Sequence, residues 1–140
     1  RMKMQLHNTS QYAIRLVSYI AKKSEAQLCS AKELSQTLTI PYKFLTKIMA
    51  SLVRAEIIVS VKGREGGYKL AKKSSDIRII DILDVFNERV NESKCVLGIG
   101  ECDCSNKCAL HDQWIVPKNL IQKMFEETTL DNLDGDNFKI

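Results

Sequence analysis

Four of the chain's five cysteines and one of its two histidines lie within the seventeen residues from Cys95 to His111. The thiols belong to Cys95, Cys102, Cys104 and Cys108, and two residues separate the last of them from the imidazole. Thiolates are soft donors that select zinc, copper(I) and iron-sulfur clusters. The chain begins without the apolar stretch of a signal peptide, so we expect it to be cytoplasmic. In that reducing compartment, clustered thiols indicate metal, cluster or redox chemistry rather than disulfides.

Three kinds of chemistry fit this spacing. Structural zinc sites usually present two pairs of close ligands, and Cys104 with Cys108 supplies one pair beside His111 and an upstream cysteine. Six residues separate Cys95 from Cys102, and five separate Cys102 from Cys108. Wide, glycine-bearing spans are better suited to wrapping the several iron and sulfide atoms of a cluster than a single ion. The spacing therefore favours an iron-sulfur cluster, with zinc and a metal-free thiol switch as the alternatives.

The residues before the cysteines begin with two predicted helices. Apolar residues three and four positions apart predict an amphipathic helix from Thr9 to about Lys23, with Thr9 or Ser10 as its N-cap. Ser30 opens a second short helix, because Glu33 follows it at capping-box spacing.

A third helix and a hairpin complete this part of the chain. Pro41 suits the first turn of that helix. The side chains of its predicted inward face are Phe44, Leu45, Ile48, Met49 and Leu52. The β-branched run IIVSV and the segment YKL are predicted strands on either side of the glycine-rich turn KGREGG. Helices in this order followed by a hairpin are typical of a winged helix-turn-helix.

The rest of the chain predicts a short helix, a loop and a long helix. The short helix lies in IRIIDILDVFN, and its inward residues are Ile79, Ile82, Leu83 and Phe86. The cysteine stretch that follows has the composition of a loop. From Ala109 the apolar pattern returns and predicts a long helix. Pro117 stands in its middle, so either the helix kinks there or a new helix starts with Pro117 in its first turn.

Basic residues are concentrated in the third helix and the hairpin, although the net charge is only +4. Eight basic and two acidic residues lie between Ile40 and Lys73, whereas the segment from Glu126 to Asp136 is acidic. The candidate DNA contacts are Lys43, Thr46, Lys47, Arg54, Lys62, Arg64 and Gly66. Cationic and hydroxyl side chains on a helix reach base edges and phosphates in the major groove, and a hairpin can grip the adjacent minor groove. We predict double-stranded promoter DNA as the partner, with a protein-binding winged helix as the competing interpretation.

Other functions find less support in the sequence. No run of about 18 apolar residues is present, so no membrane partner is expected. No nucleophile, base and oxyanion-binding set emerges, so an enzyme is not expected. An electron-transfer protein would use a cluster but has no need of a basic helix and hairpin. Cys29 stands apart from the other thiols and is expected to be a small buried hydrophobe.

Three segments together resemble a known group of bacterial regulators, and the resemblance covers nearly the whole chain. They are IPYKFLTKIMASLVRAEIIVSVKGREGGYKLAK, then IRIIDIL, and the run CALHDQW that includes the third of three matching cysteines. The group is typified by the iron-sulfur cluster regulator IscR and the nitric oxide sensor NsrR. The resemblance implies a homodimeric winged-helix repressor or activator that holds an iron-sulfur cluster at the base of a long dimerisation helix.

The resemblance also implies a set of cluster ligands. It maps the three thiolates onto Cys95, Cys102 and Cys108, and in the IscR branch the fourth ligand is a histidine, here His111. In the NsrR branch an aspartate of the partner's first helix takes that place, and the matching residue here is Gln11, which is a poor ligand. The spacing of six residues before Cys102, where the family usually has five, and the additional Cys104 depart from the family pattern. Cys104 is a possible substitute ligand. A histidine ligand favours a 2Fe-2S cluster over a 4Fe-4S cluster.

The sequence thus predicts a mainly α fold with a small β-hairpin: a winged helix-turn-helix plus a long C-terminal dimerisation helix. The expected divisions are a DNA-binding domain (1–90), a cluster-binding loop (91–108), a dimerisation helix (109–130) and a flexible tail (131–140). The predicted function is sequence-specific transcription regulation, with DNA affinity controlled by an iron-sulfur cluster that senses redox, nitric oxide or cluster status. The alternative is a cluster-free thiol- or zinc-based regulator of the same fold.

Overall fold

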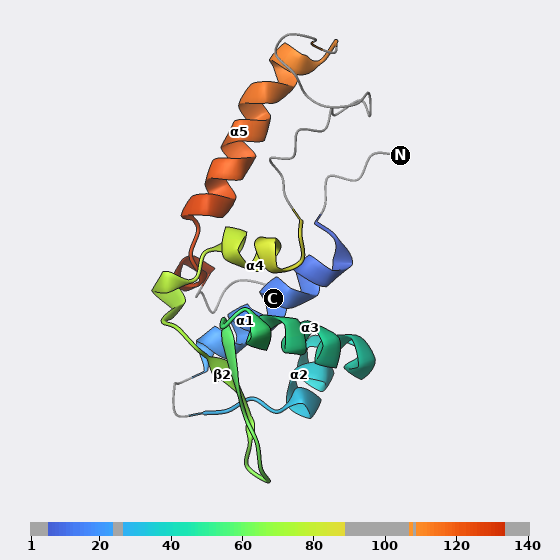
Figure 1. The fold of residues 1–140 in the computed structure, drawn as a ribbon, viewed down its shortest axis with the longest axis vertical. Coiled ribbons are helices and arrows are strands. Elements are labelled where there is room, and N and C mark those ends of the chain that lie inside the picture. Colours follow the sequence, from blue (N-terminus) through green and yellow to red (C-terminus); the bar gives the residue numbers. More distant parts are fainter. Residues whose placement is uncertain (1–5, 24–26, 89–106, 108, 134–140) are drawn as a thin grey trace.

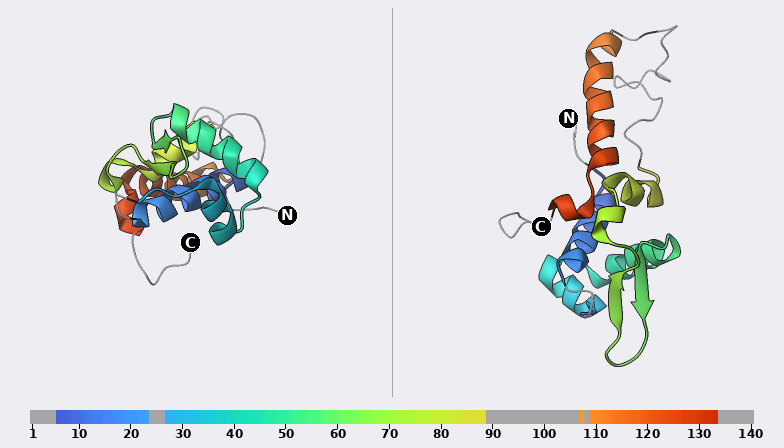
Figure 2. Two further views of the ribbon diagram at one scale, coloured as in Figure 1. Left: turned by 90° about the horizontal axis from the view of Figure 1, so that it is seen from below. Right: turned by 90° about the vertical axis from the view of Figure 1, so that its left-hand side faces the viewer.

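The computed structural model describes residues 6–23, 27–88, 107 and 109–133. The elements are α1 (Asn8–Lys22), α2 (Ala31–Leu38), α3 (Tyr42–Arg54), β1 (Ile58–Val61), β2 (Gly67–Leu70), the 3-10 turn η1 (Ser74–Asp76), α4 (Ile79–Val85), α5 (His111–Glu127) and the 3-10 turn η2 (Leu130–Leu133). Helices α1 to α4 and the hairpin form one body, and α5 projects from it on the side opposite the hairpin tip (Figures 1 and 2). A mainly helical chain with an antiparallel hairpin confirms the predicted fold class.

Helix α1 begins one residue earlier than predicted, and its N-cap is His7 rather than Thr9 or Ser10. The backbone N–H of His7 donates to both carboxylate oxygens of Glu88, at 3.0 and 3.1 Å. A carboxylate beside a helix N-terminus is stabilising because it faces the positive end of the helix dipole. Ser10 lies inside the helix and is fully buried. The start of α1 is therefore set by a residue 81 positions away in the sequence.

The connection between α2 and α3 is a tight turn held by hydrogen bonds. The hydroxyl of Ser30 accepts from the N–H of Glu33 at 3.0 Å, as the capping-box spacing predicted. Thr39 then adopts a left-handed conformation with φ of 55°, which ends α2. The hydroxyl of Ser35 donates to the carbonyl of Ile40 at 2.6 Å, and the Arg15 guanidinium donates to a carbonyl in the last turn of α2. The bonds made by Ser35 and Arg15 hold the turn from which α3 starts.

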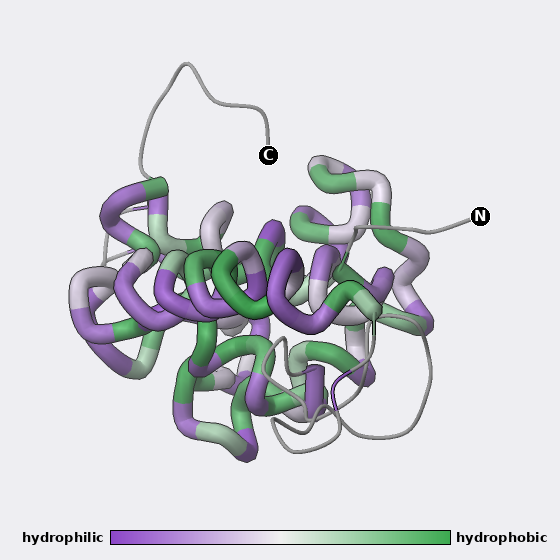
Figure 3. Tube along the Cα trace, turned by 90° about the horizontal axis from the view of Figure 1, so that it is seen from above, coloured by the Kyte–Doolittle hydropathy of each residue, from purple (hydrophilic) through white to green (hydrophobic). Residues whose placement is uncertain are grey.

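One hydrophobic core joins α1, α2, α3, the hairpin and α4. Hydrophobic and hydrophilic residues alternate along the helices, as Figure 3 shows. Of the predicted inward residues of α3, Leu45, Ile48, Met49 and Leu52 are buried. Phe44 was predicted to join them but is 55% exposed. It precedes Ile48 by one turn at the edge of the apolar face, so its ring lies beside the core.

The hairpin has an antiparallel register in which Ile58 pairs with Leu70 and Val61 with Gly67. The segment before α2 joins it, because Cys29 and Tyr68 exchange two backbone hydrogen bonds of 3.0 and 2.8 Å. A Cβ atom on Gly67 would lie 2.7 Å from the carbonyl oxygen of Cys29. On Gly66 it would lie 2.1 Å from that of Val61. Glycine is required at both positions because other backbone lies so close.

Helices α4 and α5 are tied together near the body. Ile79, Ile82 and Leu83 are buried as predicted, and Phe86 lies half-buried just after α4. The N–H of Ile79 donates to the carbonyl of Thr128 at 2.9 Å, directly after the end of α5. The N–H of Leu130 donates to the carbonyl of Ile77 at 3.0 Å, and Leu130 is only 1% exposed. The C-terminal end of α5 is therefore anchored to the body.

Helix α5 runs without a break through Pro117, so no new helix begins there. The start of the region expected to be a flexible tail contains η2, and residues 134–140 lie outside the described part of the chain. No helix among the described residues is long and apolar enough to cross a membrane.

Candidate nucleic-acid interface

The outward side of α3 carries most of the predicted DNA contacts. Lys43, Lys47 and Arg54 are exposed, and Thr46 is half-buried. This side is set by the burial of the opposite face in the core and by the turn that orients the N-terminus of α3. An α-helix with long cationic side chains on its open face has the width and chemistry to lie in the DNA major groove.

Two of these side chains bond within α3 itself. The Thr46 hydroxyl donates to the Lys43 carbonyl at 3.1 Å, so its oxygen remains available as an acceptor. The Arg54 guanidinium donates to the Ser51 hydroxyl at 3.3 Å, and this hydroxyl donates in turn to the Lys47 carbonyl at 3.3 Å. Arg54 uses one of its five N–H groups in this bond, so the others remain available for a phosphate.

The hairpin tip supplies a second group of cations. Lys62 and Arg64 are exposed there, and the half-buried Gly66 donates its N–H to the Gly63 carbonyl at 3.0 Å across the turn. The tip is the part of the body farthest from α5 (Figure 1). Within the hairpin, the missing Cβ of Gly66 makes room for the carbonyl of Val61.

The cations of α3 and the hairpin tip are not neutralised within the described part of the chain. The ion pairs there join other residues, and Lys43, Lys47, Arg54, Lys62 and Arg64 have none. Unpaired cations on two neighbouring elements create a positive surface, which attracts a polyanion.

Two aromatic residues of this surface were missed by the sequence reasoning. Tyr42 is 57% exposed at the first position of α3, and the misassigned Phe44 lies two residues further on. Phe44 and Lys47 also line a largely apolar cavity of about 400 Å³ that reaches Tyr12 and Phe86. The signal was present in the sequence: in a helix whose inward face centres on Leu45 and Ile48, residues 42 and 44 lie at the two opposite edges of that face.

Of the predicted metal ligands, the structure describes only His111. Cys95, Cys102, Cys104 and Cys108 lie outside the described residues, and no group of potential ligands gathers among the rest. His111 is the first residue of α5 and is only 5% exposed, so it is a buried residue at the head of that helix. Imidazole and thiolate are both good ligands for iron in clusters, so the donor set of the sequence fits such a group.

Cys29 is confirmed as a buried, free thiol. Burial, with a smaller contribution from the carboxylate of Glu33, raises the pKa of its thiol to about 11. An unfolded thiol ionises with a pKa of about 8.5. Because only the unfolded chain gains by ionising in this range, stability is expected to fall as the pH rises from about 8.5 towards 11.

The same shift predicts that Cys29 resists alkylation. At pH 8 the folded protein should show almost no carbamidomethyl label on the Cys29 peptide after treatment with iodoacetamide, because the thiol is both protonated and inaccessible. The same peptide should be labelled fully in guanidinium chloride, as mass spectrometry would show. Equal labelling in both conditions would contradict the buried assignment.

Comparison with known proteins identifies the family to which the chain is similar. Residues 6–135 match the Rrf2 family, described as iron-dependent transcriptional regulators. The HTH-type transcriptional regulator NsrR of Oceanobacillus iheyensis is 32% identical over 133 residues, which cover 93% of this chain and 89% of the relative. The HTH-type transcriptional regulator IscR of Vibrio atlanticus is 27% identical over 134 residues, covering 96% and 77%.

A solved structure shares the fold. CymR, the global cysteine regulator of B. subtilis, aligns with a TM-score of 0.80 over 94% of this chain and 97% of its own, at 23% identity. At this identity the likeness shows a common fold.

Proposed function

The chain belongs to the Rrf2 family of DNA-binding transcriptional regulators, and we propose that an iron-sulfur cluster controls its affinity for promoter DNA. Cys95, Cys102, Cys108 and His111 are the proposed ligands, and Cys104 is a possible substitute. In this proposal residues 1–90 read the DNA, residues 91–108 hold the cluster, residues 109–130 form the dimerisation helix and residues 131–140 form a tail. The protein acts in the cytoplasm, where promoter DNA lies and thiols stay reduced.

The observation that carries the DNA-binding part is the set of cations on α3 and the hairpin tip that have no ion-pair partner among the described residues. Lys43, Thr46, Lys47 and Arg54 are the proposed major-groove contacts, and Lys62, Arg64 and Gly66 are the proposed contacts of the wing. Because DNA binding through phosphates releases condensed counterions, the affinity should fall steeply with salt. A protein-binding winged helix would lack that steep dependence.

Two observations support the cluster. The family is described as iron-dependent, and the chain has three thiols at the positions to which the resemblance assigns cluster ligands, with one residue more before Cys102 than the family usually has, followed by a histidine. That histidine is buried at the head of α5, which removes the simple interpretation of His111 as an exposed surface residue. A histidine ligand favours a 2Fe-2S cluster over a 4Fe-4S cluster.

The structure offers a path from the cluster region to the DNA-reading elements. His111 begins α5, and the opposite end of α5 is bonded to the segment around Ile77 and Ile79 that joins the hairpin to α4. At the other side of the loop, Glu88 caps α1, which packs on α3 and β2. A cluster held between Glu88 and His111 would therefore act on both ends of the body, and it shifts the population towards whichever arrangement it prefers.

We further propose that the protein is a homodimer through α5. Val116, Leu120 and Met124 follow one another at intervals of one turn and are 60%, 62% and 51% exposed. An apolar stripe along a projecting helix is unfavourable in water, and a second copy of the same helix can cover it.

Replacing Leu120 with aspartate should convert the dimer to a monomer, because the carboxylate would be buried against an apolar partner. Asn119→Asp adds the same group to an exposed position next to it and should leave the dimer intact. Size-exclusion chromatography with light scattering distinguishes the two outcomes. A dimer that survives Leu120→Asp would place the interface elsewhere.

The ultraviolet-visible spectrum of anaerobically purified protein, before and after nitric oxide and air, tests the cluster. We expect a brown protein with iron and sulfide close to stoichiometric amounts and a visible absorbance that is lost on exposure. A colourless protein that contains zinc, or no metal, would overturn the cluster proposal. It would favour the second candidate, a thiol- or zinc-based regulator of the same fold.

A further inference from the structure

A lysine-lined pocket lies at the base of the hairpin, away from the tip that carries Lys62 and Arg64. Its walls come from the last turn of α1, strand β2 and the segment that leads from β2 to η1. Its volume is about 330 Å³, which is within the range of sites for small molecules, about 300–1,000 Å³. Neither the DNA-facing residues of α3 nor those of the hairpin tip line it.

Among the lining residues that the structure describes, four are lysines and none is acidic. They are Lys23, Lys69, Lys72 and Lys73. Within the described part of the chain, no carboxylate forms an ion pair with Lys69, Lys72 or Lys73. Lys23 lies over the ring of Tyr19, with its Nζ atom 5.2 Å from the centroid. Four like charges around one small space repel one another, and an anion among them relieves that repulsion.

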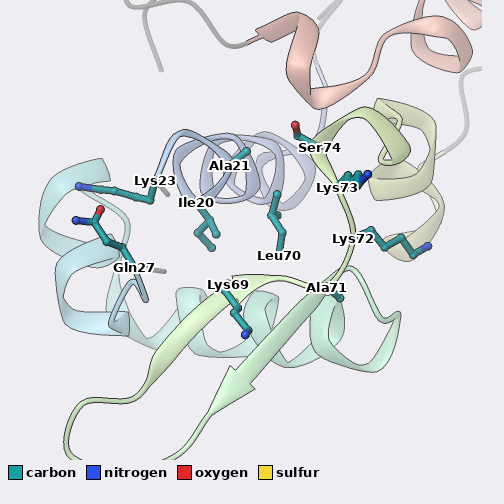
Figure 4. A pocket seen from close by; sticks show the side chains of 10 residues that line it. All are labelled: Ile20, Ala21, Lys23, Gln27, Lys69, Leu70, Ala71, Lys72, Lys73 and Ser74. Carbon is teal, nitrogen blue, oxygen red and sulfur yellow. The ribbon is translucent and has the colours of Figure 1, made fainter. Parts of the chain in front are cut away.

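The middle of the pocket is apolar. Ile20 is buried and Leu70 half-buried, and Ala21 and Ala71 complete this surface. Figure 4 shows Ile20 and Leu70 between Lys23 on one side and Lys72 and Lys73 on the other. An inorganic ion would use only the lysines, whereas a ligand with an apolar part would also cover these side chains.

We propose that this pocket binds a small organic anion: a phosphate or carboxylate group attached to a compact apolar body. The anionic group is held by the lysine ammonium groups and the apolar body lies on Ile20 and Leu70. Lysine is suited to this role because its ammonium group is a mobile point charge that can follow anions of different shapes.

The occupied pocket also affects DNA binding, and this part rests on the proposed function. Strand β2 forms both a wall of the pocket and half of the wing. A bound anion neutralises positive charge at the base of the wing, within reach of DNA phosphates at low salt. The anion is therefore expected to weaken the protein–DNA complex, so the pocket is an effector site for the DNA-binding elements α3 and the hairpin.

Isothermal titration calorimetry of the full, anaerobically prepared chain tests the binding step without DNA. The probes are phenyl phosphate, inorganic phosphate, which lacks the apolar part, and phenol, which lacks the charge. Phenyl phosphate should bind about tenfold more tightly than inorganic phosphate, because its ring removes apolar surface from water. Phenol should show no saturable binding. Equal affinity for the two phosphates would overturn the apolar part of the proposal, and no binding of either would overturn the site.

Substitutions locate the binding. Lys69→Gln and Lys73→Gln should each weaken phenyl phosphate binding by about fivefold, the upper end for a solvent-exposed ion pair. Lys32→Gln removes an equal charge from an exposed position of α2 outside the pocket and should change nothing. Ala71→Glu, which places a carboxylate at the pocket wall, should abolish binding. Equal losses in the Lys32 and Lys73 variants would reduce the effect to overall charge and contradict the site.

The phosphates of the DNA backbone are the other anions that these lysines could bind. This alternative is tested with a DNA duplex selected from a random library for binding to this protein. If Lys69 and Lys73 contacted DNA directly, each variant would lower the salt dependence of DNA binding by about one unit of slope. If the salt dependence falls in this way and phenyl phosphate does not bind, the pocket is a DNA contact and the proposal of a small-anion site is overturned. If the protein binds phenyl phosphate but no DNA duplex, the anion site is supported and the proposed function is overturned instead.

Discussion

Replacing Cys102 with alanine is expected to leave the protein without iron and sulfide. The proposed site has three thiolates and one imidazole, and removing the middle thiolate leaves a cluster with an open coordination position. Iron content should fall from about one cluster per chain to near zero, because clusters are held by their cysteine thiolates. Iron and sulfide analysis after anaerobic purification measures the loss, together with the visible spectrum.

The other cysteines provide matched controls for this experiment. Cys29→Ala should keep the cluster, because Cys29 is buried between α2 and the hairpin and bonds through its backbone to Tyr68. Cys104→Ala tests whether Cys104 is a ligand. If the variant retains its iron, the ligands are Cys95, Cys102, Cys108 and His111. If the iron is lost, Cys104 is also a ligand. A Cys102→Ala protein with full iron content would refute the ligand assignment.

Alanine at Lys47 and at Arg64 is expected to weaken the promoter complex by about tenfold each, or about 1.4 kcal/mol, in the lower half of the range for a specific side-chain contact. The two residues lie on different reading elements, α3 and the hairpin tip, and share no partner in the structure. Their effects should therefore add, so that the double variant loses about a hundredfold. Loss of a side chain that contacts a phosphate should also lower the salt dependence of binding. Fluorescence anisotropy at several salt concentrations measures both quantities.

Lys32→Ala is the control for charge, because this lysine is exposed on α2 and outside the proposed surface. Thermal unfolding controls for folding: Lys47 and Arg64 are exposed, so their loss should change stability by no more than about 0.5 kcal/mol. If both variants bind the promoter as tightly as the unchanged protein, α3 and the hairpin are not the reading elements.

The features that could be predicted from the sequence depend on residues close together in the chain. The Ser30 cap depends on Glu33, three positions away, and its hydrogen bond is present. The hairpin follows from two β-branched or aromatic segments around a glycine-rich turn. The buried face of α3 follows from helical periodicity, with the exception of Phe44 at its edge. Such interactions form within one or two turns of chain, so their residue types appear as a local pattern.

For the candidate site, the sequence predicted the types of the residues better than it predicted their surroundings in the fold. The basic residues of α3 and the hairpin are exposed as expected, because the pattern that buries one face of a helix leaves the other to solvent. The surroundings of His111 were not predictable, because whether a residue at the start of a helix is buried depends on what packs against it. The ligand assignments themselves depend on resemblance and spacing, and the experiments above test them.

By itself the sequence determined the class of fold, and it supplied the residue types of the proposed reading elements and of the Cys95 to His111 region, since each depends on residue type and short-range spacing. Only the tertiary structure decided that Glu88 caps α1, that Leu130 anchors the end of α5, and that four lysines surround one pocket. Each of these contacts joins segments far apart in the chain. Their physical cause is the shared burial of apolar faces, which brings the segments together, and no local pattern records which segments will meet.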